Sequence, residues 1–386
     1  MNAREAQQCG AETLTRSRFT ISAMKVFSSL RRLVSALSCA LVSALSSTPL
    51  AALLVFLTLL CRPAHAEMHT FVLDEPAAHE VFLAGEMTQW ERLKIPMRRG
   101  GDGKWRASVD LAPGQWLYKF IVDGRWIADP AHHDNDADGQ GGRHSFVFIG
   151  AGDWSEQPIV PRGQVDTWVV PSPAWGKAMK LNIYLPPGFE RGRPYPVLWL
   201  LHGSGMDADQ WHKTGKVERY MDRLIDRGAV RPFVIVMPSS GNVPYNGVSE
   251  RFITLELPLW LERTYGLRPG RGASGVAGMS MGGLGALLLP LLHPQRYSFS
   301  ISLSGAFDDE FIGRLPNPLP LPSTTLLLCG QQDTLVTGNR KLVQALQARQ
   351  SRFSYREDSG GHTWNYWSQR MSEMLRAADG AFAAAR

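Results

Sequence analysis

Gly278-Met-Ser-Met-Gly282 lies between an apolar run and a helical stretch of small residues. This pattern is typical of a strand-to-helix turn so sharp that the side chain of Ser280 projects into open space. A β-carbon at Gly278 or Gly282 would collide with the neighbouring strand or helix, and Ser280 must hold a strained backbone. The stretch therefore predicts a serine nucleophile, provided that a base and an acid follow it in the chain.

The base is sought downstream, because chains with this turn place the nucleophile first, the acid second and the histidine last. Only His293 and His362 follow Ser280. His293 ends the helix predicted after the turn, where a histidine often caps carbonyl groups. His362 lies in Ser359-Gly-Gly-His-Thr-Trp364, a glycine-rich loop that can reach across the top of a sheet. We therefore predict His362 as the general base.

The predicted acid is Asp333, which closes Leu326-Leu-Leu-Cys-Gly-Gln-Gln-Asp333, an apolar strand followed by a short turn. A carboxylate there would fix the imidazole tautomer of His362 and stabilise the imidazolium. Asp308 and Asp309 follow another strand and are the alternative, although they are also typical of a solvated turn.

An oxyanion hole needs backbone N–H groups that point at the developing charge. Met281, the residue after the nucleophile, is expected to supply one. The loop Leu201-His-Gly-Ser-Gly-Met206 follows an early strand, and its glycines allow close approach, so the N–H of Ser204 is the expected second donor. His202 in this loop is interpreted as structural.

From residue 164 onward, apolar strands alternate with helical stretches. The expected strands cover 180–185, 197–201, 233–237, 272–278, 299–303, 325–329 and 353–356. The expected helices cover 217–227, 251–265, the stretch after Ser280, 340–349 and a last helix from Trp364. This alternation predicts an α/β domain over 164–386 with a mostly parallel sheet covered on both faces. Such sheets bind ligands at the carboxyl ends of their strands, where every candidate residue falls.

A different pattern precedes this domain. Short strand-like pieces cover 69–73, 80–84, 105–110, 116–122 and 145–149, and turn signals such as Asp123-Gly124 separate them. They predict a small antiparallel β-sandwich of the immunoglobulin-like kind over 67–150. A linker rich in proline and polar residues is expected over 151–163.

Residues 1–66 have the order of a secretory signal peptide: a basic region, an apolar run over 49–61 and Ala64-His-Ala66. We expect cleavage after Ala66 and a periplasmic or secreted protein; a retained membrane anchor is the alternative. The length of this segment suggests that Met24 is the true start. Only if the segment stays uncleaved is a membrane expected as a partner.

The chain has 386 residues, of which 44% are hydrophobic and 20% charged. It holds 41 Lys and Arg against 35 Asp and Glu, and residues 1–66 hold seven of the former and two of the latter. The remaining 34 and 33 nearly balance, so charge gives no reason to expect nucleic acid. Cys329 is the only cysteine after residue 66, which excludes an intrachain disulfide there.

Two stretches of the first domain resemble a carbohydrate-binding module. They are Val81-Phe-Leu-Ala-Gly-Glu-Met-Thr-Gln-Trp90 and Leu117-Tyr-Lys-Phe-Ile-Val-Asp-Gly-Arg-Trp126. They resemble the glycogen-binding, isoamylase N-terminal type, and that resemblance implies a sugar platform of Trp90, Lys119 and Trp126. The alternative is that the two tryptophans are core or domain-interface residues.

The second domain carries motifs that resemble the esterase D superfamily over about residues 165–380. They are Tyr195-Pro-Val-Leu-Trp-Leu-Leu-His-Gly-Ser-Gly205, Trp211, Glu256-Leu-Pro258, the turn at 278–282 and Gly360-Gly-His-Thr-Trp364. The group includes feruloyl, acetyl-xylan and enterochelin esterases, S-formylglutathione hydrolases and mycolyltransferases. The resemblance implies a serine carboxylesterase without metal or organic cofactor, and places Ser280, Asp333 and His362 in its triad.

Four functions are compatible with these features. Export and a carbohydrate-binding-like module favour hydrolysis of acyl groups on carbohydrates, such as acetyl or feruloyl esters. Hydrolysis of a siderophore trilactone is the second, and it would need a basic pocket rim, for which Lys213, Lys216 and Arg251 are candidates. Acyl transfer would use the same triad with water excluded. A non-catalytic carbohydrate-binding protein is the fourth, and an intact triad argues against it.

Overall fold

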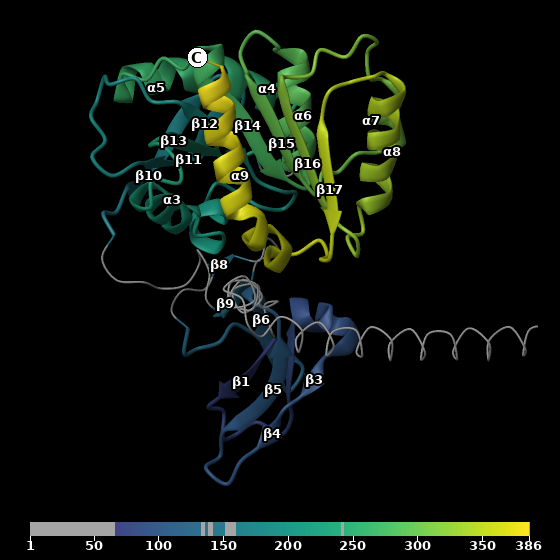
Figure 1. The fold of residues 1–386 in the computed structure, drawn as a ribbon. Coiled ribbons are helices and arrows are strands. Elements are labelled where there is room, and N and C mark those ends of the chain that lie inside the picture. The colour runs from purple at the N-terminus through teal and green to yellow at the C-terminus, as the bar shows by residue number, and fades with distance from the viewer. Residues whose placement is uncertain (1–65, 133–135, 138–141, 151–159, 241–242, 386) are drawn as a thin grey trace, which may run out of the picture. The chain divides into compact units, whose positions relative to one another are not determined.

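The computed structural model describes residues 66–132, 136–137, 142–150, 160–240 and 243–385 (Figure 1). Residues 1–65 of the predicted signal segment and 151–159 of the predicted linker lie outside these ranges. Of the helices that the structure describes, none combines the length and apolar character that crossing a bilayer requires.

The first part of the described chain is all β apart from two short 3₁₀ helices, η1 (Glu86–Thr88) and η2 (Trp90–Leu93). Its strands are β1 (Glu67–Leu73), β2 (Val81–Gly85), β3 (Ile95–Pro96), β4 (Arg98–Arg99), β5 (Trp105–Leu111), β6 (Gly114–Val122), β7 (Arg125–Ile127), β8 (Asp136–Ala137) and β9 (Arg143–Ile149). One antiparallel sheet has the order β1-β5-β4 and the other β3-β2-β6-β9-β8, with β7 beside β6. Phe71, Tyr118 and Phe120 are buried in the core of this module. The predicted β-rich module is confirmed.

The second part is built on one eight-stranded sheet of order β10-β11-β13-β12-β14-β15-β16-β17. Its strands are β10 (Gln164–Ser172), β11 (Lys177–Leu185), β12 (Val197–Leu201), β13 (Val234–Pro238), β14 (Ser274–Met279), β15 (Phe299–Leu303), β16 (Thr324–Gly330) and β17 (Ser354–Asp358). The six strands from β13 to β17 along this order pair in parallel, whereas β10 and β11 are antiparallel to their neighbours. The prediction of a mostly parallel sheet is confirmed.

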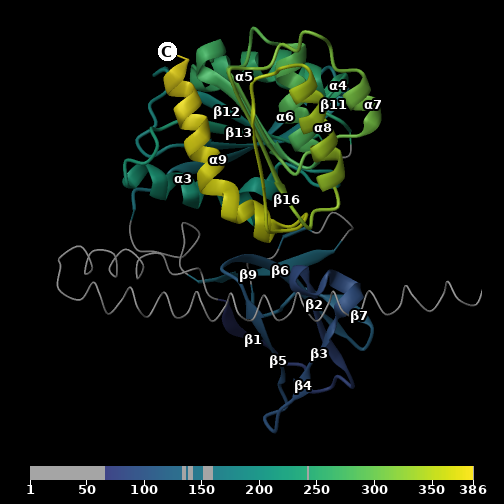
Figure 2. The same cartoon turned by 45° about the vertical axis from the view of Figure 1, so that its right-hand side comes forward.

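Helices cover both faces of this sheet (Figures 1 and 2). They are α3 (Val217–Asp226), α4 (Val248–Arg251), α5 (Leu257–Tyr265), α6 (Met281–Leu292), α7 (Asp309–Gly313), α8 (Val336–Ala348) and α9 (Trp364–Ala384), with the shorter turns η3 (Gln210–Thr214), η4 (Phe252–Glu256) and η5 (Arg271–Ala273).

Strand β12 shows why helices must pack on both faces of the sheet. Its side chains alternate between the faces, and all five are buried. Leu198 and Leu200 join the cluster that includes α3 and α9, whereas Trp199 joins the cluster that includes α5 and α6. A strand buried on both sides reads as a continuous apolar run, which is how it appears in the sequence.

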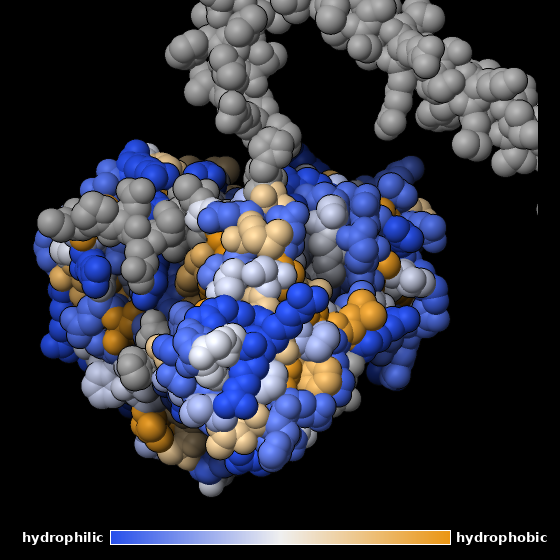
Figure 3. Space-filling model, turned by 90° about the horizontal axis from the view of Figure 1, so that it is seen from below, coloured by the Kyte–Doolittle hydropathy of each residue, from blue (hydrophilic) through white to orange (hydrophobic). Residues whose placement is uncertain are grey.

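The β-sandwich contacts the α/β part through one face of β6 and β9. Leu117 and Phe146 lie opposite each other on these strands and belong to the same buried cluster as Trp211 and Trp364. The buried Gln115 side chain donates a hydrogen bond to the carbonyl of Thr214 at 2.6 Å. On the surface seen in Figure 3, hydrophobic residues lie in small groups between hydrophilic ones.

The edge strand β10 differs from the sequence-based expectation, which begins the sheet at residue 180. Five of its nine residues are exposed and two are buried, so it lacks the continuous apolar run of the inner strands. Its place in the sheet depends on the nine-residue antiparallel pairing with β11.

Candidate active site

Ser280 connects β14 to α6 in a backbone conformation with positive φ that side chains rarely adopt, with φ 56° and ψ −121°. A β-carbon on Gly278 would lie 2.4 Å from the carbonyl oxygen of Gly282, and one on Gly282 would lie 2.3 Å from that of Leu201. Both distances are far below van der Waals contact, so only glycine fits at either position. The steric reading of the pentapeptide is confirmed, and the turn presents the Ser280 hydroxyl at the end of the sheet.

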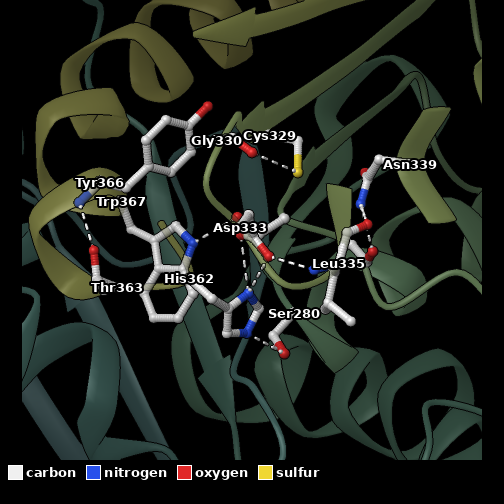
Figure 4. A network of polar contacts seen from close by, with 12 residues as sticks. Ser280, Cys329, Gly330, Asp333, Leu335, Asn339, His362, Thr363, Tyr366 and Trp367 are labelled. Atoms are coloured by element: carbon white, nitrogen blue, oxygen red, sulfur yellow. Dashed lines mark hydrogen bonds and ion pairs between the residues drawn. The ribbon is translucent and has the colours of Figure 1, made fainter. Parts of the chain in front are cut away.

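Ser280, His362 and Asp333 form one line of hydrogen bonds (Figure 4). Asp333 follows β16 and His362 precedes α9, so both reach the edge of the sheet where β14 ends. Nδ1 of His362 lies 3.0 Å from each carboxylate oxygen of Asp333. Because Nδ1–H donates to this carboxylate, Nε2 is left to accept the Ser280 hydroxyl at 3.0 Å.

Asp333 is held by further donors. The N–H of Leu335 donates to its carboxylate at 2.8 Å, and the hydroxyl of Ser304 donates to it as well. Burial alone would raise the pKa of Asp333, but hydrogen bonds from His362, Ser304 and Leu335 and the charge of His362 outweigh burial and lower it. The group is therefore an ionised acceptor for His362 at neutral pH.

Ser304 and Trp367 support the site without having been predicted from the sequence. The indole N–H of Trp367 donates to Oγ of Ser304 at 3.1 Å, which leaves the Ser304 hydroxyl to donate to Asp333. The Trp367 ring also meets the His362 ring edge to face, with centroids 5.0 Å apart. Both residues are buried and distant in sequence from Asp333, and a lone serine or tryptophan carries no motif.

The alternative residues lie in structural contacts elsewhere. His293 caps the end of α6, and its Nε2 lies 2.8 Å from Glu250. Asp308 caps α7 by accepting the N–H of Phe311 at 2.7 Å. Asp309 forms an ion pair with Lys341.

The loop after β12 lies against Ser280. A β-carbon built on Gly203 would stand 3.3 Å from Cβ of Ser280, and Ser204 lines the same pocket. Met281 is the first residue of α6, so its N–H has no carbonyl one turn earlier in the helix to bond. Met281 and Ser204 thus lie close to the Ser280 side chain, and their N–H groups stay the predicted donors of the oxyanion hole.

The His202 side chain holds this loop in place through two hydrogen bonds. Its Nδ1 donates to the carbonyl of Gly203 at 2.7 Å, and its Nε2 accepts the N–H of Ser240 at 2.8 Å. Burial lowers the pKa of His202, so the ring is neutral, as this pair of contacts requires. Its own carbonyl accepts the hydroxyl of Tyr245 at 3.0 Å.

A cavity of about 230 Å³ opens beside Ser280 and His362. The hydrolase side contributes Gly203, Ser204, Met206, Thr363, Trp364 and Trp367. The β-sandwich contributes Glu86, Trp90 and Leu117, so both parts of the chain form the wall. Three tryptophans, Leu117 and Met206 form its apolar surface, and among the described residues that line it Glu86 is the only carboxylate.

The three residues of the predicted sugar platform do not form one exposed surface. Trp90 lines the cavity beside Ser280 and packs against the core cluster shared with α9. Lys119 is buried in β6 opposite Ala84, whereas Trp126 on β7 is 37% exposed. Trp90 is therefore partly buried beside the triad, and Trp126 lies at the surface.

The basic residues considered for a pocket rim are not among the residues that line this cavity. Lys213 forms an ion pair with Asp209 at 2.7 Å, and the Lys216 ammonium lies 5.1 Å from the centre of the Phe146 ring. Arg251 ends α4 and is exposed. Within the described ranges, no group of His, Cys, Asp and Glu is arranged to hold a metal ion.

Comparison with known proteins fits this geometry. Residues 172–318 match the family model described as "Putative esterase". Residues 70–155 match the model of the glycogen recognition site of AMP-activated protein kinase. Both resemblances stated from the sequence are thus confirmed: the second domain is similar to the esterase model and the first to the glycogen-recognition model.

Two relatives illustrate the likeness in sequence. An endo-1,4-beta-xylanase/feruloyl esterase of Xylanibacter ruminicola is 26% identical over 274 residues, which are 65% of this chain and 36% of that protein. An esterase of Mycobacterium tuberculosis is 34% identical over 209 residues, 49% of this chain and 42% of that protein. The chain thus spans less than half the length of either relative.

Two solved structures share the fold. The enterobactin esterase of Shigella flexneri superposes with a TM-score of 0.65 at 18% identity, covering 83% of this chain and 97% of that one. A ferulic acid esterase superposes with a TM-score of 0.53 at 23% identity, covering 58% of this chain and all of that one.

Proposed function

We propose that the protein is a serine carboxylesterase that works through an acyl-enzyme. The observation that carries this proposal is the line of 3.0 Å contacts from Ser280 through His362 to Asp333. Spacing of this kind, with the acid on the far ring nitrogen, suits proton transfer from a serine hydroxyl.

In the first half of the reaction, Oγ of Ser280 attacks the ester carbonyl while Nε2 of His362 takes its proton. Asp333 stabilises the imidazolium that results. The N–H groups of Met281 and Ser204 donate hydrogen bonds to the oxyanion of the tetrahedral intermediate. The intermediate collapses when His362 protonates the departing alcohol. In the second half, water loses a proton to His362 and attacks the acyl carbon. As the bond from that carbon to Oγ breaks, His362 returns the proton to Oγ, which releases the acid and restores Ser280.

We propose acylated carbohydrate, such as an acetyl or feruloyl ester of a polysaccharide, as the substrate class. Trp90 supports this choice, because an aromatic face beside the reacting serine can stack on a pyranose ring. One relative is named as a feruloyl esterase attached to a xylanase, in keeping with such a substrate. Trp126, which is exposed on β7, remains a proposed contact for a longer glycan, whereas Lys119 is buried in β6 and is not proposed as one.

Two other reactions share this machinery. A trilactone ester of a siderophore is anionic, and the cavity lining contains none of the three cations that would favour it. Acyl transfer differs only in the acceptor that reaches the acyl-enzyme. We further propose that the protein acts in the periplasm or outside the cell, on the basis of the signal-like order of residues 1–66.

The test compares wild type with Ser280→Ala on p-nitrophenyl acetate. We expect turnover by wild type and a loss of about 10³-fold or more in Ser280→Ala. Equal rates in the two proteins would leave only a binding function. A screen of acids released from feruloylated xylan, acetylated xylan and a catecholate trilactone then identifies the substrate class.

The same screen tests Trp90. In Trp90→Ala, we expect KM to rise several-fold for the carbohydrate ester and to stay unchanged for p-nitrophenyl acetate, because loss of one ring contact costs about 1 kcal/mol. Trp168→Ala is the matched control, because Trp168 is an exposed tryptophan of β10 and is not among the residues that line the cavity. An equal effect of Trp90→Ala on both esters would argue against sugar stacking.

A further inference from the structure

Glu86 is a half-buried carboxylate in the wall of the active-site cavity, and the mechanism above does not use it. It is the first residue of η1, directly after β2 of the sandwich. No cation accompanies it: in the described part of the chain, its hydrogen-bond donors are backbone N–H groups. A carboxylate that loses part of its hydration needs hydrogen-bond donors in exchange, so a partner set made of amides alone calls for an explanation.

The donors come from both parts of the chain. Leu117 of β6 donates to Oε2 at 3.2 Å within the sandwich. Trp364 donates to Oε1 at 2.5 Å and Asn365 to Oε2 at 3.3 Å, and these two residues lie 278 and 279 positions away. Glu86 therefore ties the sandwich to the start of α9.

Trp364 and Asn365 are the first two residues of α9, and their N–H groups have no partner within the helix. Thr363, the N-cap, accepts the third N–H, that of Tyr366, at 3.3 Å. Glu86 satisfies the first two, and the negative charge also suits the positive end of a 21-residue helix. The whole first turn of α9 thus has partners.

His362 directly precedes this turn. Thr363 and Trp367 lie on one side of His362 in Figure 4, and the Trp367 ring lies against the imidazole. A shift at the start of α9 would move the imidazole away from Ser280, and a displacement of about 1 Å at a reacting group can cost on the order of a hundredfold in rate.

We propose that Glu86 is a positioning residue of the esterase reaction: by holding the first turn of α9, the sandwich keeps His362 at hydrogen-bond distance from Ser280. This inference rests on the proposed function. It also gives the N-terminal module a part in catalysis that is separate from any binding of sugar.

The positioning role of Glu86 depends on pH, because it depends on whether the carboxyl is protonated. Burial, opposed by the three N–H groups, raises the pKa of Glu86 to about 7. His362 is the other titratable group that lines the cavity. Other titratable or charged groups lie on the elements next to Glu86. Strand β6 carries Lys119 and Tyr118, and the Tyr118 phenol donates to Asp129, whereas Arg92 of η2 contacts Gln89. Protonation would remove acceptor strength from Glu86 and loosen the turn.

The test uses Glu86→Gln, which keeps the shape but has a single acceptor oxygen for Trp364 and Asn365. We expect kcat for p-nitrophenyl acetate to fall about tenfold with KM within about twofold, since a misplaced base affects the chemical step more than binding. Gln115→Leu, which removes another bond between the two parts away from the cavity, should keep wild-type kcat.

A second readout needs no variant. Over about one pH unit below 7, kcat/KM of wild type should fall more steeply than the tenfold per unit that one proton produces, and Glu86→Gln should restore the one-proton slope. A one-proton slope in wild type, or an unchanged kcat in folded Glu86→Gln, would overturn the proposal. Failure of the esterase function itself would show separately, as equal rates for wild type and Ser280→Ala.

Discussion

At the scale of single residues, the contacts of each aspartate separate the acid from its alternatives. Asp333 is 3% exposed and accepts from His362, Leu335 and Ser304. Asp308 is occupied as a helix cap. All are aspartates that follow strands, so the sequence pattern could rank them but could not show which one reaches the imidazole.

Asp333→Asn is expected to lower kcat by about 10³–10⁴-fold, because an amide no longer fixes the imidazole tautomer or stabilises the imidazolium. The pKa of Asp333 is lowered, so the group stays ionised as the pH falls through the range in which a histidine titrates. Steady-state kinetics on p-nitrophenyl acetate measure the loss. Asp308→Asn should retain wild-type kcat, since asparagine also caps helices; a similar loss there would contradict the assignment.

At the scale of elements, the site is made where β12, β14, β16 and β17 end. Parallel strands bring their carboxyl ends to one edge, so residues 204, 280, 333 and 362 meet although up to 158 positions separate them. The order of strands and helices was readable from apolar runs and glycines. The edge strand β10 was not, because its exposed residues leave no such run.

The turn at 278–282 depends on close contact between α6 and β12. Gly282→Ala would place a β-carbon 2.3 Å from the carbonyl oxygen of Leu201, and overpacking of this kind costs about 1–3 kcal/mol. We expect a lower melting temperature and loss of ester turnover. Gly270→Ala is the control, because nothing lies within 4 Å of the added carbon. Equal melting temperatures for the two variants would refute the steric argument.

At the scale of the whole molecule, the β-sandwich and the α/β part share a core and a cavity. Leu117 and Phe146 are buried in one cluster with Trp211 and Trp364, and Glu86 and Trp90 form the cavity wall on the sandwich side. The module is therefore a structural part of the site, whatever its affinity for glycans.

The half-buried Glu86 carboxyl links the stability of this assembly to pH. Its pKa is 4.5 ordinarily and about 7 when folded, so between these values the folded state holds more protons than the unfolded state. The free energy of unfolding should therefore fall as the pH rises from 4.5 to 7, by on the order of 3 kcal/mol from this group. Denaturant unfolding of wild type against Glu86→Gln measures the difference.

Glu357→Gln is the control for that experiment. A hydrogen bond from Arg340 lowers the pKa of Glu357 to about 2, so its contribution is present above pH 4.5 and is lost only as the pH falls towards 2. Its difference from wild type should be the same at pH 5 and pH 7. A pH-independent difference for Glu86→Gln as well would mean that the pKa of the Glu86 carboxyl is not raised in the folded state.

The sequence by itself determined the α/β order, the strained serine turn and the identity of the serine, histidine and aspartate candidates, because glycine sterics and apolar periodicity are local properties. Tertiary structure alone decided that Asp333 reaches His362, that Ser304 donates to Asp333 and that Trp367 donates to Ser304. It also decided that Glu86 of the sandwich holds the start of α9. These contacts join residues up to 279 positions apart, and no local pattern records which distant amides a half-buried carboxylate will meet.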